Sequence, residues 1–111
     1  MISRLWRGVA MPAEADPYVR HLQRETFPQL ARIPGFLSAS ILRRPIAAGG
    51  EFVVVTTWQT MDAIRKFAGS AADAAVVPPA VQAMMVEYDA TVAHYEVVDT
   101  FSRPHAEARE P

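Results

Sequence analysis

The sequence predicts one α+β domain built on a four-stranded antiparallel sheet. Its 111 residues make a single domain that buries roughly 65% of its unfolded surface. Stretches with β-branched and aromatic residues alternate with stretches of helical spacing, in the order strand, helix, strand, strand, helix, strand. We expect the domain to span residues 1–99. Residues 100–111 are polar and contain two prolines, which predicts a mobile tail.

The first strand and the first helix are predicted over the opening third of the chain. Residues 2–10 carry apolar side chains among polar neighbours, which is typical of a strand. Asp16 and Pro17 predict a helix start, because aspartate accepts a bond from a free backbone N–H and proline has none to satisfy. Pro28 falls inside this helix and is expected to kink or divide it. Pro34-Gly35 then ends it.

A hairpin and a second helix are predicted next. Residues 36–45 and 51–58 read as strands joined by a loop with two glycines at its end. Thr60 is a good N-cap for the helix that follows, and Gly69 lies where a left-handed C-terminal cap is expected.

The end of the domain is predicted as a short helix and a last strand. The prolines before residue 80 favour a helix over residues 80–88, with inward-facing apolar side chains at Val81, Met84, Met85 and Tyr88. Residues 91–98 read as the final strand. Right-handed crossovers then give the strand order 4-1-3-2 with the helices on one face, which is the ferredoxin-like split βαβ plan.

The third strand also predicts a partner. Phe52 and Val54 point to one face of the sheet, whereas Val53 and Val55 point to the other. Helices cover only one face, so the second apolar face is expected to pack against the same face of another copy in a homodimer. The alternative is a row of valines that stays half exposed.

Composition excludes several classes of function. The net charge is -1 and no basic run exceeds Arg43-Arg44, so neither nucleic acid nor a membrane surface is an expected partner. Cysteine is absent, and the histidines at positions 21, 94 and 105 have no metal-ligand spacing. No apolar run is long enough for a signal peptide core or a membrane span. We expect a cytoplasmic protein without a metal or cofactor.

Four sequence motifs resemble the antibiotic biosynthesis monooxygenase family of dimeric α/β-barrel proteins. They are RLWRG, PGF, EFVVVTTW followed by AIRKFAG, and VAHYEVV, and the resemblance covers residues 2–98. It implies a cavity between sheet and helices in each subunit, and Trp58 matches a tryptophan that lines this cavity in characterised oxygenases. Those enzymes also use an asparagine on an early strand, and this residue has no counterpart here because the chain contains no asparagine. A heme-ligating histidine is also missing between His21 and His94.

Three residues are candidates for catalysis. Trp58 can stack on a flat, electron-rich ring, or it can be a core aromatic. His94 can move a proton near neutral pH, or it can bond to a neighbouring strand. Arg4 and Arg7 point to opposite faces of the first strand, and Arg7 is our candidate for stabilising a substrate oxygen anion. Its alternative is an ion pair at the interface, with Glu51 or Glu96 as a possible partner.

Trp6, Tyr88 and Met84 are the candidates for substrate binding. Packing is the alternative for Trp6, surface capping or packing for Tyr88, and a place in the core for Met84. These residues support two functions. The first is a cofactor-free monooxygenase for a small aromatic or quinol-type substrate, and the second is a non-catalytic dimer that binds a small apolar ligand or acts in a stress response. Heme degradation is disfavoured.

Overall fold

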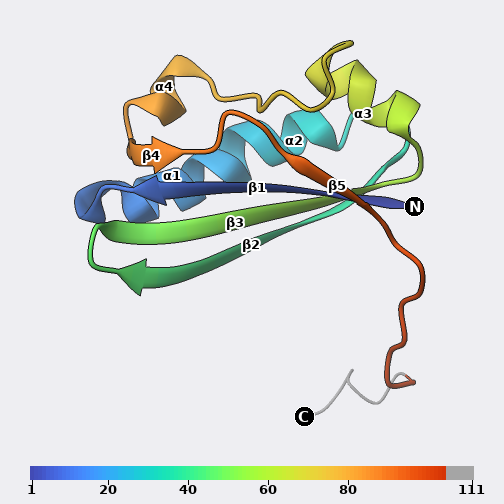
Figure 1. Cartoon of the computed structure of the whole chain (residues 1–111), viewed down its shortest axis with the longest axis horizontal. Helices are drawn as coiled ribbons and strands as arrows, with labels where there is room; N and C mark the ends of the chain where they lie inside the picture. Colours follow the sequence, from blue (N-terminus) through green and yellow to red (C-terminus); the bar gives the residue numbers. More distant parts are fainter. Residues whose placement is uncertain (105–111) are drawn as a thin grey trace.

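The computed structural model describes residues 1–104; the remainder of the predicted tail, 105–111 with His105, lies outside the described residues. Figure 1 shows one sheet with the helices gathered on one side of it. The strands are β1 (Ile2–Ala10), β2 (Phe36–Ile46), β3 (Gly49–Trp58), β4 (Met85–Tyr88) and β5 (Ala93–Glu96). The helices are η1 (Pro12–Glu14), α1 (Ala15–His21), the π-helical η2 (Leu22–Thr26), α2 (Phe27–Leu30), α3 (Met61–Ala68) and α4 (Pro79–Gln82).

The sheet has the order β2-β3-β1-β4, and every paired strand is antiparallel to its neighbour. β1 is central and pairs with β3 from Ile2 opposite Trp58 to Ala10 opposite Gly50. Its other edge is shared, because β4 pairs with one end of β1 and β5 with the other. The predicted order 4-1-3-2 and the α+β class are therefore confirmed, with two short strands in place of one at the edge.

The helix predicted over residues 80–88 is wrong. Only Pro79–Gln82 is helical, and Met85–Tyr88 forms β4. The free edge of β1 explains the difference, since Gly8 pairs with Tyr88 and Val9 with Glu87. A strand ladder satisfies the backbone of this segment better than a helix of two turns, whose nucleation is unfavourable. The final strand is also shorter than predicted, at Ala93–Glu96.

The helix predicted after Asp16 is divided before Pro28. α1 changes into the π-helical η2, and Pro28 then stands in the first turn of α2, where its missing N–H costs little. The predicted N-cap of α3 is present, because the hydroxyl oxygen of Thr60 accepts a bond of 3.1 Å from the Ala63 N–H. Gly69 ends the helix with a positive φ of 84°, but its ψ of -173° lies outside the left-handed helical region that was predicted.

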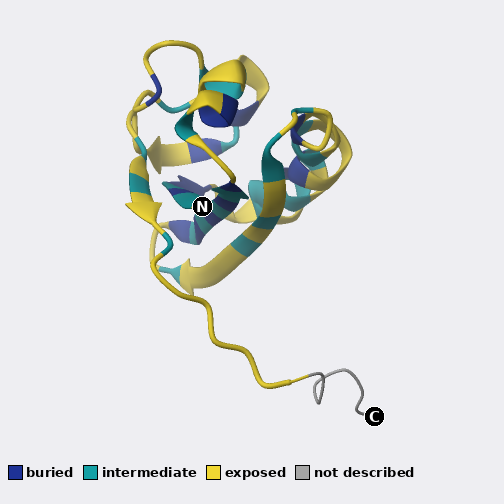
Figure 2. Ribbon diagram, turned by 90° about the vertical axis from the view of Figure 1, so that its right-hand side faces the viewer, coloured by how far each residue is buried: buried dark blue, intermediate teal, exposed yellow. Residues whose placement is uncertain are grey.

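The two faces of the sheet differ as predicted. Phe52, Val54 and Trp58 are buried beneath the helices, whereas Val53 and Val55 alternate with them and are only half-buried. Figure 2 shows the buried segments between the helices and the sheet. The face away from the helices carries no other layer of the described chain, so its apolar side chains stay accessible in one copy of the protein.

Candidate functional site

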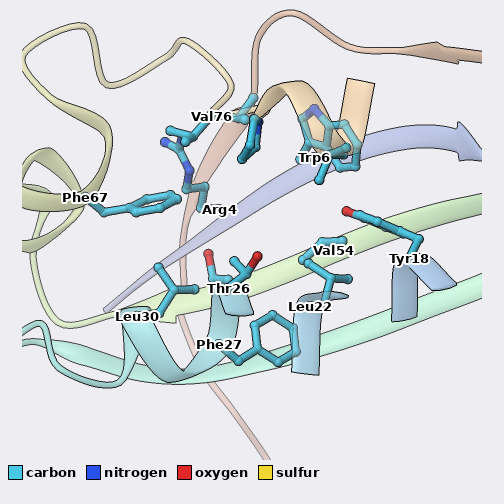
Figure 3. A pocket seen from close by; sticks show the side chains of 14 residues that line it. Arg4, Trp6, Tyr18, Leu22, Thr26, Phe27, Leu30, Val54, Phe67 and Val76 are labelled. Carbon is cyan, nitrogen blue, oxygen red and sulfur yellow. The ribbon is translucent and has the colours of Figure 1, made fainter. Parts of the chain in front are cut away.

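A pocket of about 80 Å³ lies between the sheet and the helices (Figure 3). β1 and β3 form its floor, and the segment from α1 to α2 forms one wall. α3 and the residues around α4 close the other side. The lining is mostly apolar and consists of Arg4, Trp6, Tyr18, Leu22, Thr26, Phe27, Leu30, Val54, Thr56, Phe67, Val76, Pro78, Val81 and Val92.

Arg4 is the arginine of β1 that reaches the pocket. It pairs with Thr56 across the sheet and is only 5% exposed. Arg7 pairs with Val53 and therefore lies on the opposite face. Burial lowers the pKa of the Arg4 guanidinium from its ordinary value, and the charge of Asp73 counteracts this in part. The pocket thus holds a partly desolvated positive charge.

The Arg4 guanidinium is held by neutral acceptors. It donates to the carbonyl oxygens of Ala72 at 2.6 Å and Ala74 at 3.0 Å, and it lies 5.7 Å from the centre of the Phe67 ring. None of its hydrogen bonds within the described chain goes to a carboxylate. A buried cation with no carboxylate bonded to it favours an anionic ligand, because the ligand replaces the solvation that burial removed.

His94 lies behind Arg4 and does not line the pocket. Its Nε2 is 2.9 Å from an Arg4 nitrogen, and its Nδ1 is 3.2 Å from Asp73 Oδ1. Since arginine only donates, Nε2 accepts from Arg4, and Nδ1 faces the Asp73 carboxylate. His94 therefore holds Arg4 in place, and both of its ring nitrogens face protein groups.

Trp58 is fully buried and is absent from the pocket lining. Its ring packs against Phe36 and Phe67, with centroid distances of 5.2 Å and 6.0 Å. The expected stacking of a substrate on this indole is therefore not supported. The indole N–H donates to the Thr56 hydroxyl oxygen at 2.8 Å, so the hydroxyl proton of Thr56 remains available to the pocket.

Of the three predicted binding residues, only Trp6 lines the pocket. Its indole N–H donates to the carbonyl oxygen of Asp89 at 2.8 Å, and its ring lies over Gly8. Tyr88 packs against Trp6 at a centroid distance of 6.3 Å and is 37% exposed, outside the pocket. Met84 packs against the core cluster and does not reach the lining.

Arg7 forms an ion-pair network on the open face of the sheet. Its Nε lies 2.5 Å from Glu51 Oε2, and a longer contact of 3.4 Å joins it to Glu87. Arg44 binds the other oxygen of Glu51. The hydrogen bonds from Arg44 and then Arg7 lower the pKa of Glu51. Arg7 therefore pairs with Glu51 within one copy, the dimer interface expected for this ion pair stays a prediction, and Arg7 lies on the face of the sheet away from the pocket.

Tyr18 of α1 lines the pocket, although it was not among the predicted site residues. It is 3% exposed, and its hydroxyl has no hydrogen-bond partner within residues 1–104. Burial raises the pKa of this phenol, which therefore keeps its proton. In the sequence, the only indication of this role was a single hydroxyl side chain among the apolar positions of a helix.

Within the described residues, no cluster of histidine and acidic side chains could hold a metal ion. None of the described helices has the length and apolar character needed to cross a membrane.

Comparisons with known proteins agree with this architecture. The sequence model of the antibiotic biosynthesis monooxygenase family matches residues 10–85. A comparison with curated protein sequences found no match.

Several solved structures share the fold. A variant of SnoaB, a cofactor-independent oxygenase from Streptomyces nogalater, is 17% identical with a TM-score of 0.65, and the alignment covers 92% of this chain and 97% of that one. The monooxygenase ActVA-Orf6 of Streptomyces coelicolor, in complex with nanaomycin D, is 18% identical with a TM-score of 0.63 and coverages of 92% and 90%. The heme degrader MhuD of Mycobacterium tuberculosis, with two hemes bound in its active site, is 21% identical with a TM-score of 0.57 and coverages of 92% and 100%. Identities this low establish the fold alone.

Proposed function

The chain belongs to the antibiotic biosynthesis monooxygenase family, and we propose that it is a cofactor-independent monooxygenase of a small aromatic or quinol-type substrate. The observation that carries this proposal is the Arg4 guanidinium, which is buried in an apolar pocket without a carboxylate bonded to it. Such a site favours a ring whose hydroxyl is ionised. An ionised ring is also the form that can give electrons to oxygen without a metal or cofactor.

The reaction is balanced without a further reductant. A phenol loses its hydroxyl hydrogen and the hydrogen of the opposite ring carbon, and molecular oxygen is reduced. One oxygen atom becomes the new carbonyl of the quinone and the other leaves as water. Arg4 stabilises the negative oxygen of the substrate, and the Thr56 hydroxyl donates to the same oxygen from the neighbouring position on β3.

The remaining residues position these two groups. His94 and the carbonyls of Ala72 and Ala74 fix the guanidinium. Trp58 acts through Thr56, because its N–H occupies a lone pair of that hydroxyl. The apolar walls exclude water, which strengthens the attraction between Arg4 and an anion.

Oxygen uptake tests the proposal. We expect alpha-naphthol to be converted to the para-naphthoquinone with one O₂ consumed per product. Arg4→Met is expected to lower the rate by about 10²-fold to 10³-fold, the usual loss when a donor to a developing anion is removed. Arg4→Lys is the matched control, since it keeps the charge and should keep part of the rate. An Arg4→Met variant as fast as the parent would contradict the role of Arg4.

Heme degradation is a weaker candidate because no histidine lines the pocket within residues 1–104. Tyr18 is a residue type that can bind heme iron, but burial raises its pKa and so opposes the phenolate form. Titration with hemin should leave the Soret band unchanged; a shifted band would reinstate this function.

The second candidate is a non-catalytic dimer that binds a small aromatic ligand. The same lining favours it, since a buried cation within apolar walls binds an aromatic anion whether or not oxygen reacts. It predicts that phenols bind to the pocket without oxygen uptake or product. If the parent protein binds alpha-naphthol and consumes no oxygen with it or with related phenols, this function replaces the first.

A homodimer is part of both candidates. The open face of the sheet carries Val53, Val55 and the half-exposed Leu42, together with the ion pairs of Glu51. Packing two such faces together would bury the apolar rows of both copies. Light scattering should give about twice the 12.2 kDa of one chain. Val55→Asp should return the mass of one chain, and a monomeric parent at micromolar concentration would refute the dimer.

A further inference from the structure

Tyr18 carries a hydroxyl that the proposed chemistry leaves without a role. Only 3% of the residue is exposed, and it lines the pocket. Figure 3 shows its hydroxyl oxygen pointing toward the middle of the pocket, between Trp6 and Val54. No described residue accepts or donates a hydrogen bond at this oxygen. Buried polar atoms are almost always paired, so a vacant hydroxyl aimed into a pocket points to a ligand.

Tyr18 and Arg4 lie at opposite ends of the pocket. The Tyr18 ring packs edge-on against Phe52 at a centroid distance of 4.9 Å, and Phe52 is paired with Gly8 of β1. Arg4 is four residues away on the same strand, which corresponds to roughly 13 Å along the backbone. Trp6 and Val54 form the apolar floor between the two ends.

We propose that the pocket binds a two-ended aromatic ligand, with an anionic oxygen at Arg4 and a neutral hydrogen-bond acceptor, such as a ketone or quinone carbonyl, at Tyr18. The Arg4 end rests on the proposed function, and the Tyr18 end is new. A carbonyl suits this end because the Tyr18 phenol keeps its proton and offers one donor among apolar neighbours. A second anion there would be desolvated with a single neutral donor, which is unfavourable.

Two matched probes test the ligand class. Para-hydroxyacetophenone and para-isopropylphenol have similar shapes, but only the first has a carbonyl at the end opposite its hydroxyl. The corresponding acetyl and isopropyl naphthols provide a longer pair. Affinities are measured by quenching of tryptophan fluorescence for the parent and for Tyr18→Phe, which keeps the buried ring. Thr26→Val is the control variant, because it removes another hydroxyl from the pocket lining.

We expect Tyr18→Phe to weaken the acetyl probe of at least one pair by about threefold to tenfold, as one neutral hydrogen bond is lost. The isopropyl probes should bind the parent and Tyr18→Phe equally, and Thr26→Val should keep the preference for the acetyl probe. Equal weakening of both members of a pair, loss of the preference in Thr26→Val instead, or no binding of any probe would overturn the proposal.

The carbonyl of the bound probe reports the same hydrogen bond directly. Its infrared band should lie at lower wavenumber in the parent than in Tyr18→Phe, because a hydrogen bond weakens the C=O bond; the same band in both proteins would overturn the proposal. These binding data are independent of turnover. A protein that consumes no oxygen but shows the Tyr18-dependent preference fails the proposed function alone. A protein that oxidises alpha-naphthol without this preference fails only the present inference.

Discussion

Replacing each tryptophan in turn separates a positioning role from direct ligand contact. The chain has two tryptophans, Trp6 and Trp58. Trp6 lines the pocket, whereas Trp58 is fully buried behind Thr56. We expect Trp58→Phe to reduce stability and to leave ligand binding within about threefold, the size of one neutral hydrogen bond. Trp6→Phe should keep more of the stability and weaken ligand binding by more than this.

The stability cost of Trp58→Phe follows from its contacts. The smaller ring leaves a void of roughly 40 Å³ beside Phe36 and Phe67, which costs about 1 kcal/mol when the surroundings do not collapse. Loss of the hydrogen bond to Thr56 adds about 1 kcal/mol. A total of about 2 kcal/mol should lower Tm by roughly 8 °C in a domain of this size.

Fluorescence makes the assignment direct. Each variant keeps one tryptophan, so its emission reports one site. Alpha-naphthol should quench Trp58→Phe, in which Trp6 is the remaining fluorophore, much more strongly than Trp6→Phe. Circular dichroism and thermal unfolding of the same samples show whether each variant is folded and how much stability it has lost.

The reasoning would be refuted by the reverse pattern. If Trp58→Phe keeps the Tm of the parent but loses ligand binding by tenfold or more, the indole contacts the ligand. The buried position of Trp58 would then not represent the ligand-bound state.

Three further predictions concern charge, capping and pocket shape. Glu51 has a lowered pKa in the folded protein, so its charge stabilises the fold above its unfolded pKa of about 4.3. This stabilisation disappears as the pH falls through the folded pKa. In urea unfolding, Glu51→Gln should be less stable than the parent at neutral pH, and its stability should depend less on acid pH. Thr60→Ala removes the cap of α3 and should cost about 1 kcal/mol, or roughly 4 °C in Tm, without changing ligand affinity in a fluorescence titration. In Gly8→Ala, the new Cβ would lie 2.5 Å from the Trp6 ring, so the ring must move and alpha-naphthol should bind more weakly; an unchanged titration would contradict this.

Most of the fold was predictable because local signals agreed. The cap at Thr60, the stop at Gly69 and the alternating apolar residues of the third strand each specify one structure with little influence from distant residues. The helix over residues 80–88 was mispredicted for the opposite reason. Its outcome depends on the free edge of a strand far away in the sequence, and no local pattern reports that edge.

The site was predictable only in part. Trp6 lines the pocket, so its binding role stays a prediction, and residues two apart in a strand share a face. That rule already favoured Arg4 over Arg7 as the pocket arginine, and the sequence reading did not apply it. The roles of Thr56 and Tyr18 depend on which hydroxyl protons find no acceptor after packing, which only the three-dimensional arrangement reveals.

The central position of β1 has a consequence for how the protein folds. This strand precedes every other described element, yet its edges are filled by β3 from the middle of the chain and by β4 and β5 near its end. These pairings close long loops, and long loop closure slows folding. During synthesis one edge of β1 must therefore wait for the middle of the chain and the other until almost the whole domain has been made, and an unpaired strand edge is exposed to aggregation.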